Sequence, residues 1–192
     1  RFFDAYRIDH VLGFFRIWSI PVDAVQGILG RFVPCIPVHI NEFGEKGIWF
    51  DYQRYCRPYI TDAMLENVFG ENAEKVKTDF LIENKFECYD LAPAFEKQRQ
   101  VEEHFSKEEL TQENEKLKLG LYDLISNVIL LEEEDSNGMK FHFRIGMDKT
   151  VSFENLMPPV RDKLKDLYIN YFYQRQEVCW RSEAMNKLPQ LK

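Results

Sequence analysis

Hydrophobic and polar residues follow short periods in the first part of the chain. Over residues 2–20, alternation of period two is mixed with apolar runs and ends at Pro21, which predicts a buried strand followed by a loop or a short helix. Gly and Pro then recur at close intervals in "GILGRFVPCIPV", residues 27–38, and predict an irregular loop. Further on, "KFECYDL", residues 85–91, predicts a short strand or extended segment.

Alternation returns near the last third of the chain. In "MKFHFRIGM", residues 139–147, basic side chains occupy one set of alternate positions and apolar side chains occupy the other. Because successive side chains of a strand point to opposite faces, this pattern predicts a half-buried strand whose polar face carries Lys140, His142 and Arg144. The acidic stretch before it, "EEEDSNG" at 132–138, predicts a solvated turn.

Helical signals begin near residue 60. The segment "ITDAMLENVFG", residues 60–70, predicts a helix that Thr61 or Asp62 caps and that Gly70 ends. A second helix is predicted over 72–84. Both predictions depend on apolar residues at helical spacing together with a start or stop residue.

The rest of the middle is also helical in pattern. Leucines at helical spacing predict one or two helices over 94–131, and Ser106 followed three residues later by Glu109 matches a capping box. Two prolines at 158–159 precede a long helical pattern over 160–188. The middle of the chain is therefore predicted to be a mostly helical insert between two elements of an α/β scaffold.

Composition narrows the class of protein. The 192 residues are 45% hydrophobic and 30% charged, which is typical of one soluble globular domain. The net charge of −7, without a basic stripe, argues against nucleic acid as a partner. No apolar segment is long enough to span a membrane, and the four widely spaced cysteines indicate a reduced, cytoplasmic protein. The chain opens with Arg1 in an apolar stretch, so we expect it to be a piece of a longer protein.

Candidate chemistry lies in "AYRIDHVLGFFRIWSIP", residues 5–21. Residues i and i+2 of a strand share a face, so Arg7 and Asp9 are expected to lie side by side. An adjacent guanidinium favours the ionised carboxylate, which is the form that attacks an anomeric carbon. A structural ion pair between these two residues and a hydrogen-bonded structural His10 explain the same spacing, so both interpretations stay open.

The local sequence is more specific than the spacing. The segment "YRIDHVLGFFRIWSIP" resembles the nucleophile segment of the 4-alpha-glucanotransferases, the amylomaltase or disproportionating-enzyme family of the α-amylase superfamily. The resemblance continues through "GILGRFVPCIP", "GIWFDYQRYCRPYI", "FHFRIGM" and "YFYQRQEVCWRSEAMNKLP", and so spans essentially the whole chain. The sequence Val11-Leu12-Gly13 after the motif indicates the long, plant-cytosolic type.

The resemblance implies a fold and a reaction. The fold is α/β, a partial (β/α)8 TIM barrel around strand 4 with a large, mostly helical insertion. Asp9 matches the family's nucleophile, which forms a covalent glucosyl intermediate; Arg7 matches the arginine that steadies it, and His10 matches an adjoining histidine in a supporting role. The reaction moves glucosyl or α-1,4-glucan units from maltose or maltodextrins to a glucan acceptor, with retention and without metal or cofactor.

Aromatic residues are abundant, with 16 Phe and 9 Tyr. They fill a core or line a carbohydrate surface, and burial is the interpretation we favour. Trp18 and Trp180 are our candidate substrate-binding residues, because indole rings stack on sugar faces. Trp49 is a further candidate, and core packing is the interpretation that we favour for each of the three.

A second carboxyl group is missing from the expected position. Retaining transfer needs an acid/base about 5 Å from the nucleophile. In the family it lies on the next barrel strand, in a Gly/Ala-Glu-Asp-Leu-Gly type motif that this sequence lacks. We therefore expect residues 1–40 to hold barrel strand 4 and its loop, 41–165 the insertion, 166–192 the helix toward strand 5, and the piece alone to be inactive. A non-catalytic glycan-binding or assembly module and an α-glucan hydrolase of the same superfamily are the alternatives.

Overall fold

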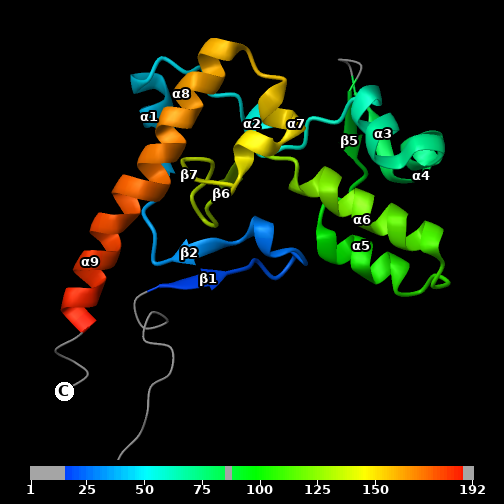
Figure 1. Ribbon diagram of the computed structural model, residues 1–192, viewed down its shortest axis with the longest axis horizontal. Coiled ribbons are helices and arrows are strands. Elements are labelled where there is room, and N and C mark those ends of the chain that lie inside the picture. Colours follow the sequence, from blue (N-terminus) through cyan, green and yellow to red (C-terminus); the bar gives the residue numbers. More distant parts are fainter. Residues whose placement is uncertain (1–15, 85–87, 188–192) are drawn as a thin grey trace, which may run out of the picture.

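The computed structural model describes residues 16–84 and 88–187, and it mixes helices with short strands (Figure 1). This mixture confirms the coarser prediction of an α/β chain. Every strand pairing within the described ranges is antiparallel, so a partial barrel of parallel strands stays a prediction. The strands are β1 (Ile17–Ser19), β2 (Arg31–Val33), β3 (Val38–His39), β4 (Leu81–Glu83), β5 (Tyr89–Leu91), β6 (Leu130–Glu132) and β7 (Lys140–Phe143). The helices are α1 (Ile40–Glu45), α2 (Tyr52–Cys56), α3 (Asp62–Phe69), α4 (Ala73–Phe80), α5 (Gln98–Phe105), α6 (Gln112–Ser126), α7 (Val151–Glu154), α8 (Pro158–Ile169) and α9 (Gln176–Lys187), with short 3-10 turns η2 (Gly27–Leu29), η3 (Gly70–Asn72) and η4 (Met147–Lys149) and a π-helical segment η5 (Asn170–Arg175).

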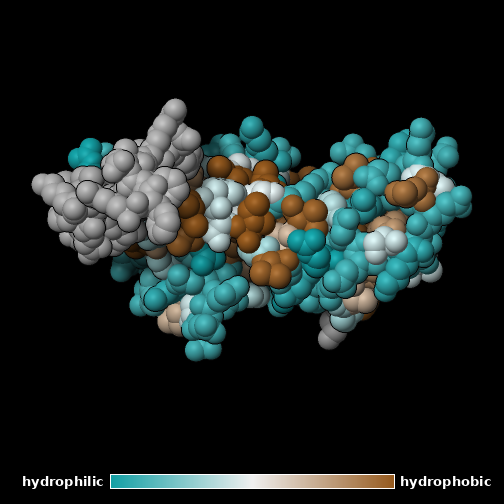
Figure 2. Space-filling model, turned by 90° about the horizontal axis from the view of Figure 1, so that it is seen from below, coloured by the Kyte–Doolittle hydropathy of each residue, from teal (hydrophilic) through white to brown (hydrophobic). Residues whose placement is uncertain are grey.

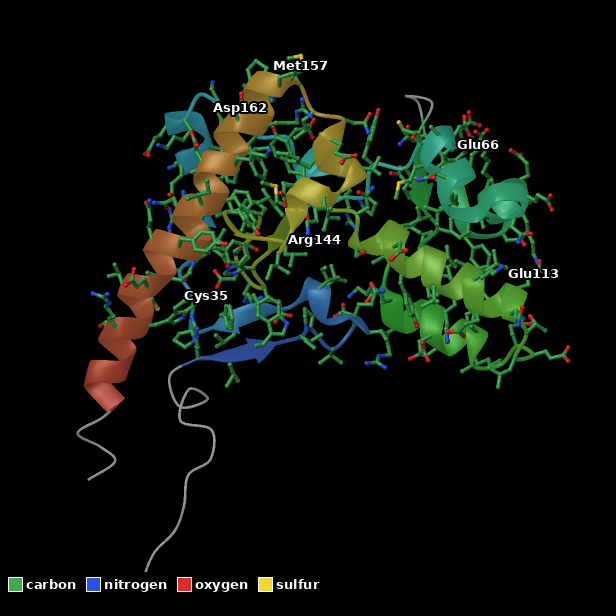
Figure 3. The ribbon with its side chains drawn as sticks, viewed as in Figure 1. Cys35, Glu66, Glu113, Arg144, Met157 and Asp162 are labelled. Atoms are coloured by element: carbon green, nitrogen blue, oxygen red, sulfur yellow. The ribbon has the colours of Figure 1, made fainter. Side chains whose placement is uncertain are left out.

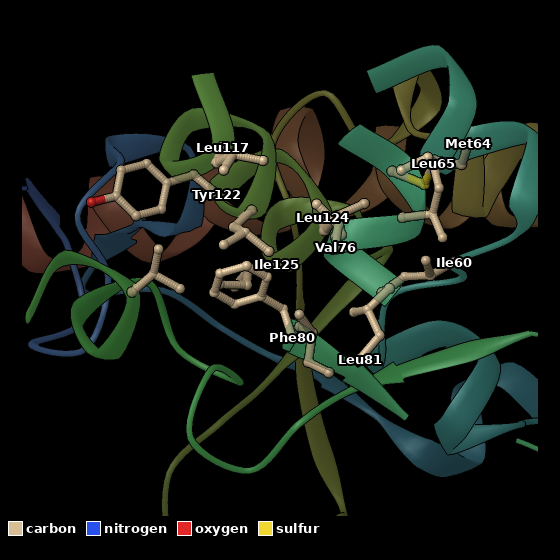
Figure 4. Packing of buried hydrophobic residues seen from close by; sticks show 14 residues of the cluster. Ile60, Met64, Leu65, Val76, Phe80, Leu81, Leu117, Tyr122, Leu124 and Ile125 are labelled. Atoms are coloured by element: carbon tan, nitrogen blue, oxygen red, sulfur yellow. The ribbon is translucent and has the colours of Figure 1, made fainter. Parts of the chain in front are cut away.

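One hydrophobic cluster, which we call the helical lobe, packs α3, α4, α5 and α6 with the β4–β5 pair (Figure 4). Thr61 Oγ1 accepts from the backbone N–H of Met64 at 3.4 Å, and Gly70, with a φ of 56°, ends α3. Both ends confirm the sequence prediction. The second predicted helix is shorter than expected, because α4 ends at Phe80 and the chain continues as β4.

The predicted capping box in the helical lobe is wrong. Ser106 ends α5, where its N–H donates to the carbonyl of Glu102 at 2.9 Å. The next helix, α6, begins after Thr111, whose Oγ1 accepts from the N–H of Asn114 at 3.1 Å. The chain has to reverse between α5 and α6 so that the two helices pack against each other, and the residues of the apparent box form that turn.

A second hydrophobic cluster, the sheet lobe, packs the β3–β7–β6 sheet against α1, α2, α7, α8 and η5. The polar face predicted for the strand at 139–147 is wrong for two basic residues, since His142 in β7 is fully buried and Arg144, just after β7, is 9% exposed. β7 is the central strand of its sheet, and Tyr171 of η5 covers the face that carries His142. Arg144 donates to the carbonyls of Ser126 and Gly146 at 3.0 and 2.9 Å (Figure 3).

The long helix after the double proline is confirmed. Pro158 occupies the first helical position, and helical structure continues from α8 through η5 into α9 along one side of the molecule (Figure 1). Pro is favoured there because its missing N–H has no intrahelical partner in any case. Across the described ranges, none of the helices combines the length and apolar character that a membrane crossing requires.

The β1–β2 hairpin forms the underside of the molecule. The prediction of an irregular loop over 27–38 is partly wrong, because this range contains the turn η2, the strand β2 and the first residue of β3. Residues 34–37 connect the two strands. The described end of the strand predicted to be buried is exposed instead: Ile17 is 54% exposed, and Val22 in the hairpin loop is 89% exposed. Figure 2 shows apolar surface gathered on this side, next to the grey atoms. The hairpin therefore presents an apolar face.

Candidate functional site

The residues predicted to carry the chemistry lie outside the described part of the chain. Arg7, Asp9 and His10 precede Arg16, where the described residues begin. Their roles stay predictions. The site is therefore built from the elements that follow them: the hairpin, the helix that crosses it, and the cleft beside it.

The two candidate substrate-binding tryptophans lie in one aromatic group. Phe32 stands between them, with ring centroids 4.9 Å from Trp18 and 5.3 Å from Trp180, both edge to face. The Arg16 guanidinium lies 4.1 Å from the centroid of the Trp180 ring and 4.9 Å from that of Phe32. This group joins β1, β2 and α9 at the point where the chain enters the hairpin.

The indole N–H groups of both tryptophans are occupied by backbone. Trp18 Nε1 donates to the carbonyl of Gly27 at 2.9 Å, and Trp180 Nε1 donates to that of Pro34 at 2.9 Å. Neither N–H is free for a sugar hydroxyl, so stacking through a ring face is the interaction left to a substrate. For Trp49 the favoured core packing is wrong, because its side chain is 88% exposed in the loop between α1 and α2.

A cleft of about 700 Å³ opens between the hairpin and the two lobes. Its buried floor includes Ile125, Val128 and Leu130. Charged side chains from the hairpin, β5 and the β6–β7 turn line the cleft, together with Arg57 just after α2 and with Glu96 and Lys97 just before α5. Lys97 pairs there with Asp23. The volume is that of a small-molecule site, and the mixture of an apolar floor with polar groups around it is typical of one.

Two groups of the cleft keep their protons at neutral pH. The Tyr52 hydroxyl donates to Glu132 Oε2 at 2.7 Å, and burial together with this hydrogen bond raises the pKa of Tyr52 to about 12. Burial, followed by the charge of Glu132, raises the pKa of the Cys56 thiol to about 12. Since a thiol and a phenol are weak nucleophiles when protonated, neither of these two side chains is prepared for nucleophilic attack at neutral pH.

The sequence did not predict this cleft. Its lining comes from separate segments between Pro21 and Glu134, and no spacing rule connects them. A weak signal was present, since Tyr52 and Cys56 belong to "GIWFDYQRYCRPYI", one of the segments that carry the resemblance.

A buried polar group lies between β7 and η5. His142 Nδ1 is 2.9 Å from the Tyr171 hydroxyl and 3.6 Å from Cys35 Sγ. Burial, and then the charge of Arg31, lower the pKa of His142 to about 3, so the ring is neutral at pH 7. Its Nε2 approaches Glu133 Oε1 at 3.6 Å, but a neutral ring makes this contact polar and not ionic. Within the described ranges, no group of three or more His, Cys, Asp and Glu side chains is placed to hold a metal ion.

Comparison with known proteins identifies a family and a curated relative. The family model described as 4-alpha-glucanotransferase matches residues 1–190. The chain is also 37% identical, over 196 aligned residues, to the protein named 4-alpha-glucanotransferase DPE2 of Oryza sativa subsp. japonica. That alignment covers 100% of this chain and 20% of the rice protein, so the chain spans about a fifth of the length of this curated relative. No solved structure matches this chain.

Proposed function

The chain belongs to the 4-alpha-glucanotransferase family, and on that premise we propose that it supplies the nucleophile-bearing part of an enzyme that transfers glucosyl or α-1,4-glucan units. The observation that carries the proposal is the family match over residues 1–190, which includes the Arg-Ile-Asp-His motif. The donors are maltose or maltodextrins and the acceptor is a glucan. We further propose that the protein acts in cytoplasmic carbohydrate metabolism.

The proposed mechanism is retaining transfer. Asp9 attacks the anomeric carbon of the donor, the glycosidic bond breaks, and a covalent glucosyl intermediate forms. Arg7 stabilises the ionised form of Asp9, and His10 supports the segment. A sugar 4-hydroxyl of the acceptor then attacks the intermediate and releases Asp9, so that two inversions give net retention.

The proposed acid/base comes from another part of the enzyme. Protonation of the leaving group contributes about 100- to 10,000-fold to such reactions. The sequence motif that would carry this glutamate is missing from the chain. We therefore expect no measurable transfer from these 192 residues alone.

The proposed architecture is a partial barrel with an insertion. In it, residues 1–40 hold barrel strand 4 and its loop, 41–165 form the insertion, and 166–192 lead toward strand 5. The apolar underside of the hairpin supports this architecture, because exposed side chains such as Ile17 and Val22 suit a surface that further barrel elements cover.

A glycan-binding module is the second candidate function, and the cleft of about 700 Å³ is the observation that favours it. The two candidates differ in their products. Transfer converts maltose into glucose and longer maltodextrins, hydrolysis by a related enzyme gives glucose alone, and a binding module gives neither product.

The test uses an enzyme that contains this whole chain together with the rest of the glucanotransferase domain. We expect it to release glucose from maltose and to form longer maltodextrins. Asp9→Asn should lower that activity by more than about 10,000-fold, as the loss of a nucleophile does. The matched control is Asp79→Asn, the same change at an exposed position of α4, which should keep activity. Equal activity of the two variants would overturn the assignment of Asp9.

A further inference from the structure

The four residues 34–37 cross the face of a helix that lies far away in the sequence. Gln176 Oε1 accepts from the N–H of Ile36 at 2.7 Å, and Gln176 Nε2 donates to the carbonyl of the same residue at 2.9 Å. One side chain therefore satisfies both backbone groups of Ile36, across 140 residues of sequence. Gln176 is 2% exposed, so water cannot replace it without a rearrangement.

Two neighbours of Gln176 hold the ends of the same segment. Trp180 Nε1 donates to the carbonyl of Pro34 at 2.9 Å, and Arg175 Nη1 donates to that of Pro37 at 2.7 Å. Arg175 is held in turn by Glu42 of α1, with which it forms an ion pair. We call Arg175, Gln176 and Trp180 the helix clamp.

The π-helical turn η5 explains how one helix presents these groups together. Tyr171, near the start of η5, lines a small pocket together with Cys35 of the segment and Gln176, and so it shares a face of the helix with Gln176. In an α-helix of 3.6 residues per turn, residues i and i+5 point about 140° apart. A π turn bonds i to i+5 and brings these positions into line, and such turns occur frequently at functional sites.

The clamp also reaches the other end of the hairpin. The ring of Trp180 contacts Phe32 of β2 and lies 4.1 Å from the guanidinium of Arg16. Arg16 stands seven positions after Asp9, so the helix anchors the chain where it leaves the proposed nucleophile segment. In the proposed architecture α9 leads toward barrel strand 5, where the resemblance implies the acid/base. On that architecture the clamp joins the elements next to both catalytic carboxyl groups.

We propose that Gln176 is a positioning residue for the transfer reaction. The inference rests on the proposed function. A retaining mechanism needs its two carboxyl groups about 5 Å apart, and the long insertion separates them in the sequence. Residues 34–37 lead into the insertion, and α9 follows it. By tying these two parts of the chain together, the helix clamp holds the two carboxyl groups at the required separation. Trp180 then acts through Arg16 and Pro34, and not as a platform for sugar.

The test compares Gln176→Met with Gln112→Met in the enzyme that contains this whole chain. The first change removes both hydrogen bonds to Ile36 at nearly constant volume. The second makes the same change at an exposed helical position away from the clamp, in α6. We expect kcat for maltose to fall about 10- to 100-fold in Gln176→Met, with KM changed less than about twofold, and both constants to be kept in Gln112→Met.

Gln176→Glu supplies a readout that a purely structural role would not move. A carboxylate cannot donate to the Ile36 carbonyl, whereas the protonated acid can. We expect the kcat of this variant, relative to the wild type, to rise as the pH is lowered, and that of Gln176→Met to show no such rise. A flat ratio for Gln176→Glu would overturn the proposal.

Amide hydrogen exchange at Ile36 separates the inference from the proposed function, because exchange does not depend on activity. Faster exchange in Gln176→Met with unchanged kcat would overturn the positioning role while the enzyme stays a transferase. A raised KM with unchanged kcat would also overturn it, in favour of a substrate contact. A wild-type enzyme that releases no glucose would overturn the proposed function, and the positioning role with it.

Discussion

Asn127 and Ser152 bind each other twice where the helical lobe meets the sheet lobe. The N–H of Ser152 donates to Asn127 Oδ1 at 2.9 Å, and Ser152 Oγ donates to the backbone carbonyl of Asn127 at 2.5 Å. Tyr59 closes the group, since its N–H donates to Ser152 Oγ at 3.0 Å and its carbonyl accepts from Asn127 Nδ2 at 3.2 Å. Three segments far apart in the sequence therefore share one buried polar node.

Ser152→Ala should destabilise the protein by about 2–4 kcal/mol. The change leaves the N–H of Tyr59 and the carbonyl of Asn127 without a partner, and each buried orphan costs about 1–3 kcal/mol. The free energy of unfolding in urea measures the loss. Ser106→Ala is the matched control, since Ser106 is exposed, and it should cost less than about 0.5 kcal/mol. Similar losses in both variants would show that the node does not stabilise the junction.

Gly120→Ala should destabilise the protein although alanine is the better helix former. A Cβ at Gly120 would lie 2.3 Å from Cε1 and 2.7 Å from Cζ of the Phe69 ring, which packs against the helical lobe. The gain in helix propensity is about 1 kcal/mol, whereas overpacking costs about 1–3 kcal/mol. We expect a lower melting temperature.

Gly44→Ala is the control for that prediction. A Cβ at Gly44, in α1, meets no atom within 4 Å, so only the gain in propensity remains. This variant should raise the stability by about 0.5–1 kcal/mol. A higher melting temperature for Gly120→Ala as well would show that the Phe69 ring moves aside without loss.

Local signals predicted the parts of the fold that depend on neighbours in the sequence. Thr61 and Gly70 bound α3, and Pro158 starts α8, because caps and a fixed proline φ act within one turn of a helix. The same kind of signal failed at Ser106, where packing of two helices required a turn. It failed again at His142, because alternation shows which face is polar but not what covers that face.

The site was predictable only in part. Asp9 entered through a resemblance, since its spacing from Arg7 fits an ordinary ion pair equally well. The contact between Gln176 and Ile36 spans 140 residues, and a single sequence holds no signal for such a pair. The cleft has the same origin, because it exists only where the two lobes and the hairpin meet.

The fluorescence of the three tryptophans should separate by exposure. Trp49 is 88% exposed, whereas the indoles of Trp18 and Trp180 donate to backbone carbonyls within the aromatic group around Phe32. We expect Trp49→Phe to remove most of the fluorescence that acrylamide quenches, and Trp18→Phe to leave it in place. The reverse result would place Trp49 against another surface. Stability should change by less than about 0.5 kcal/mol in Trp49→Phe, because nothing packs on an exposed ring.

Acid should destabilise the protein through His142. The ring is fully buried, and burial with the nearby charge of Arg31 lowers its pKa to about 3, whereas an unfolded histidine titrates near 6.5. Between these values the unfolded chain binds a proton that the folded protein does not, so stability falls as the pH falls. From about pH 6.5 to about pH 5 the loss from this residue is about 1.5 kcal/mol.

His142→Asn isolates that effect, because Asn keeps an acceptor for the Tyr171 hydroxyl and does not titrate. The free energy of unfolding in urea is measured for the wild type and for His142→Asn at about pH 6.5 and about pH 5. The difference between the two proteins cancels the pH dependence that comes from the carboxyl groups they share. The stability advantage of the wild type over the variant should shrink by about 1.5 kcal/mol on acidification. Glu133 provides the alternative, since its carboxylate lies 3.6 Å from His142 Nε2. If Glu133 held a protonated ring, the pKa would be raised, and the advantage of the wild type would grow as the pH falls.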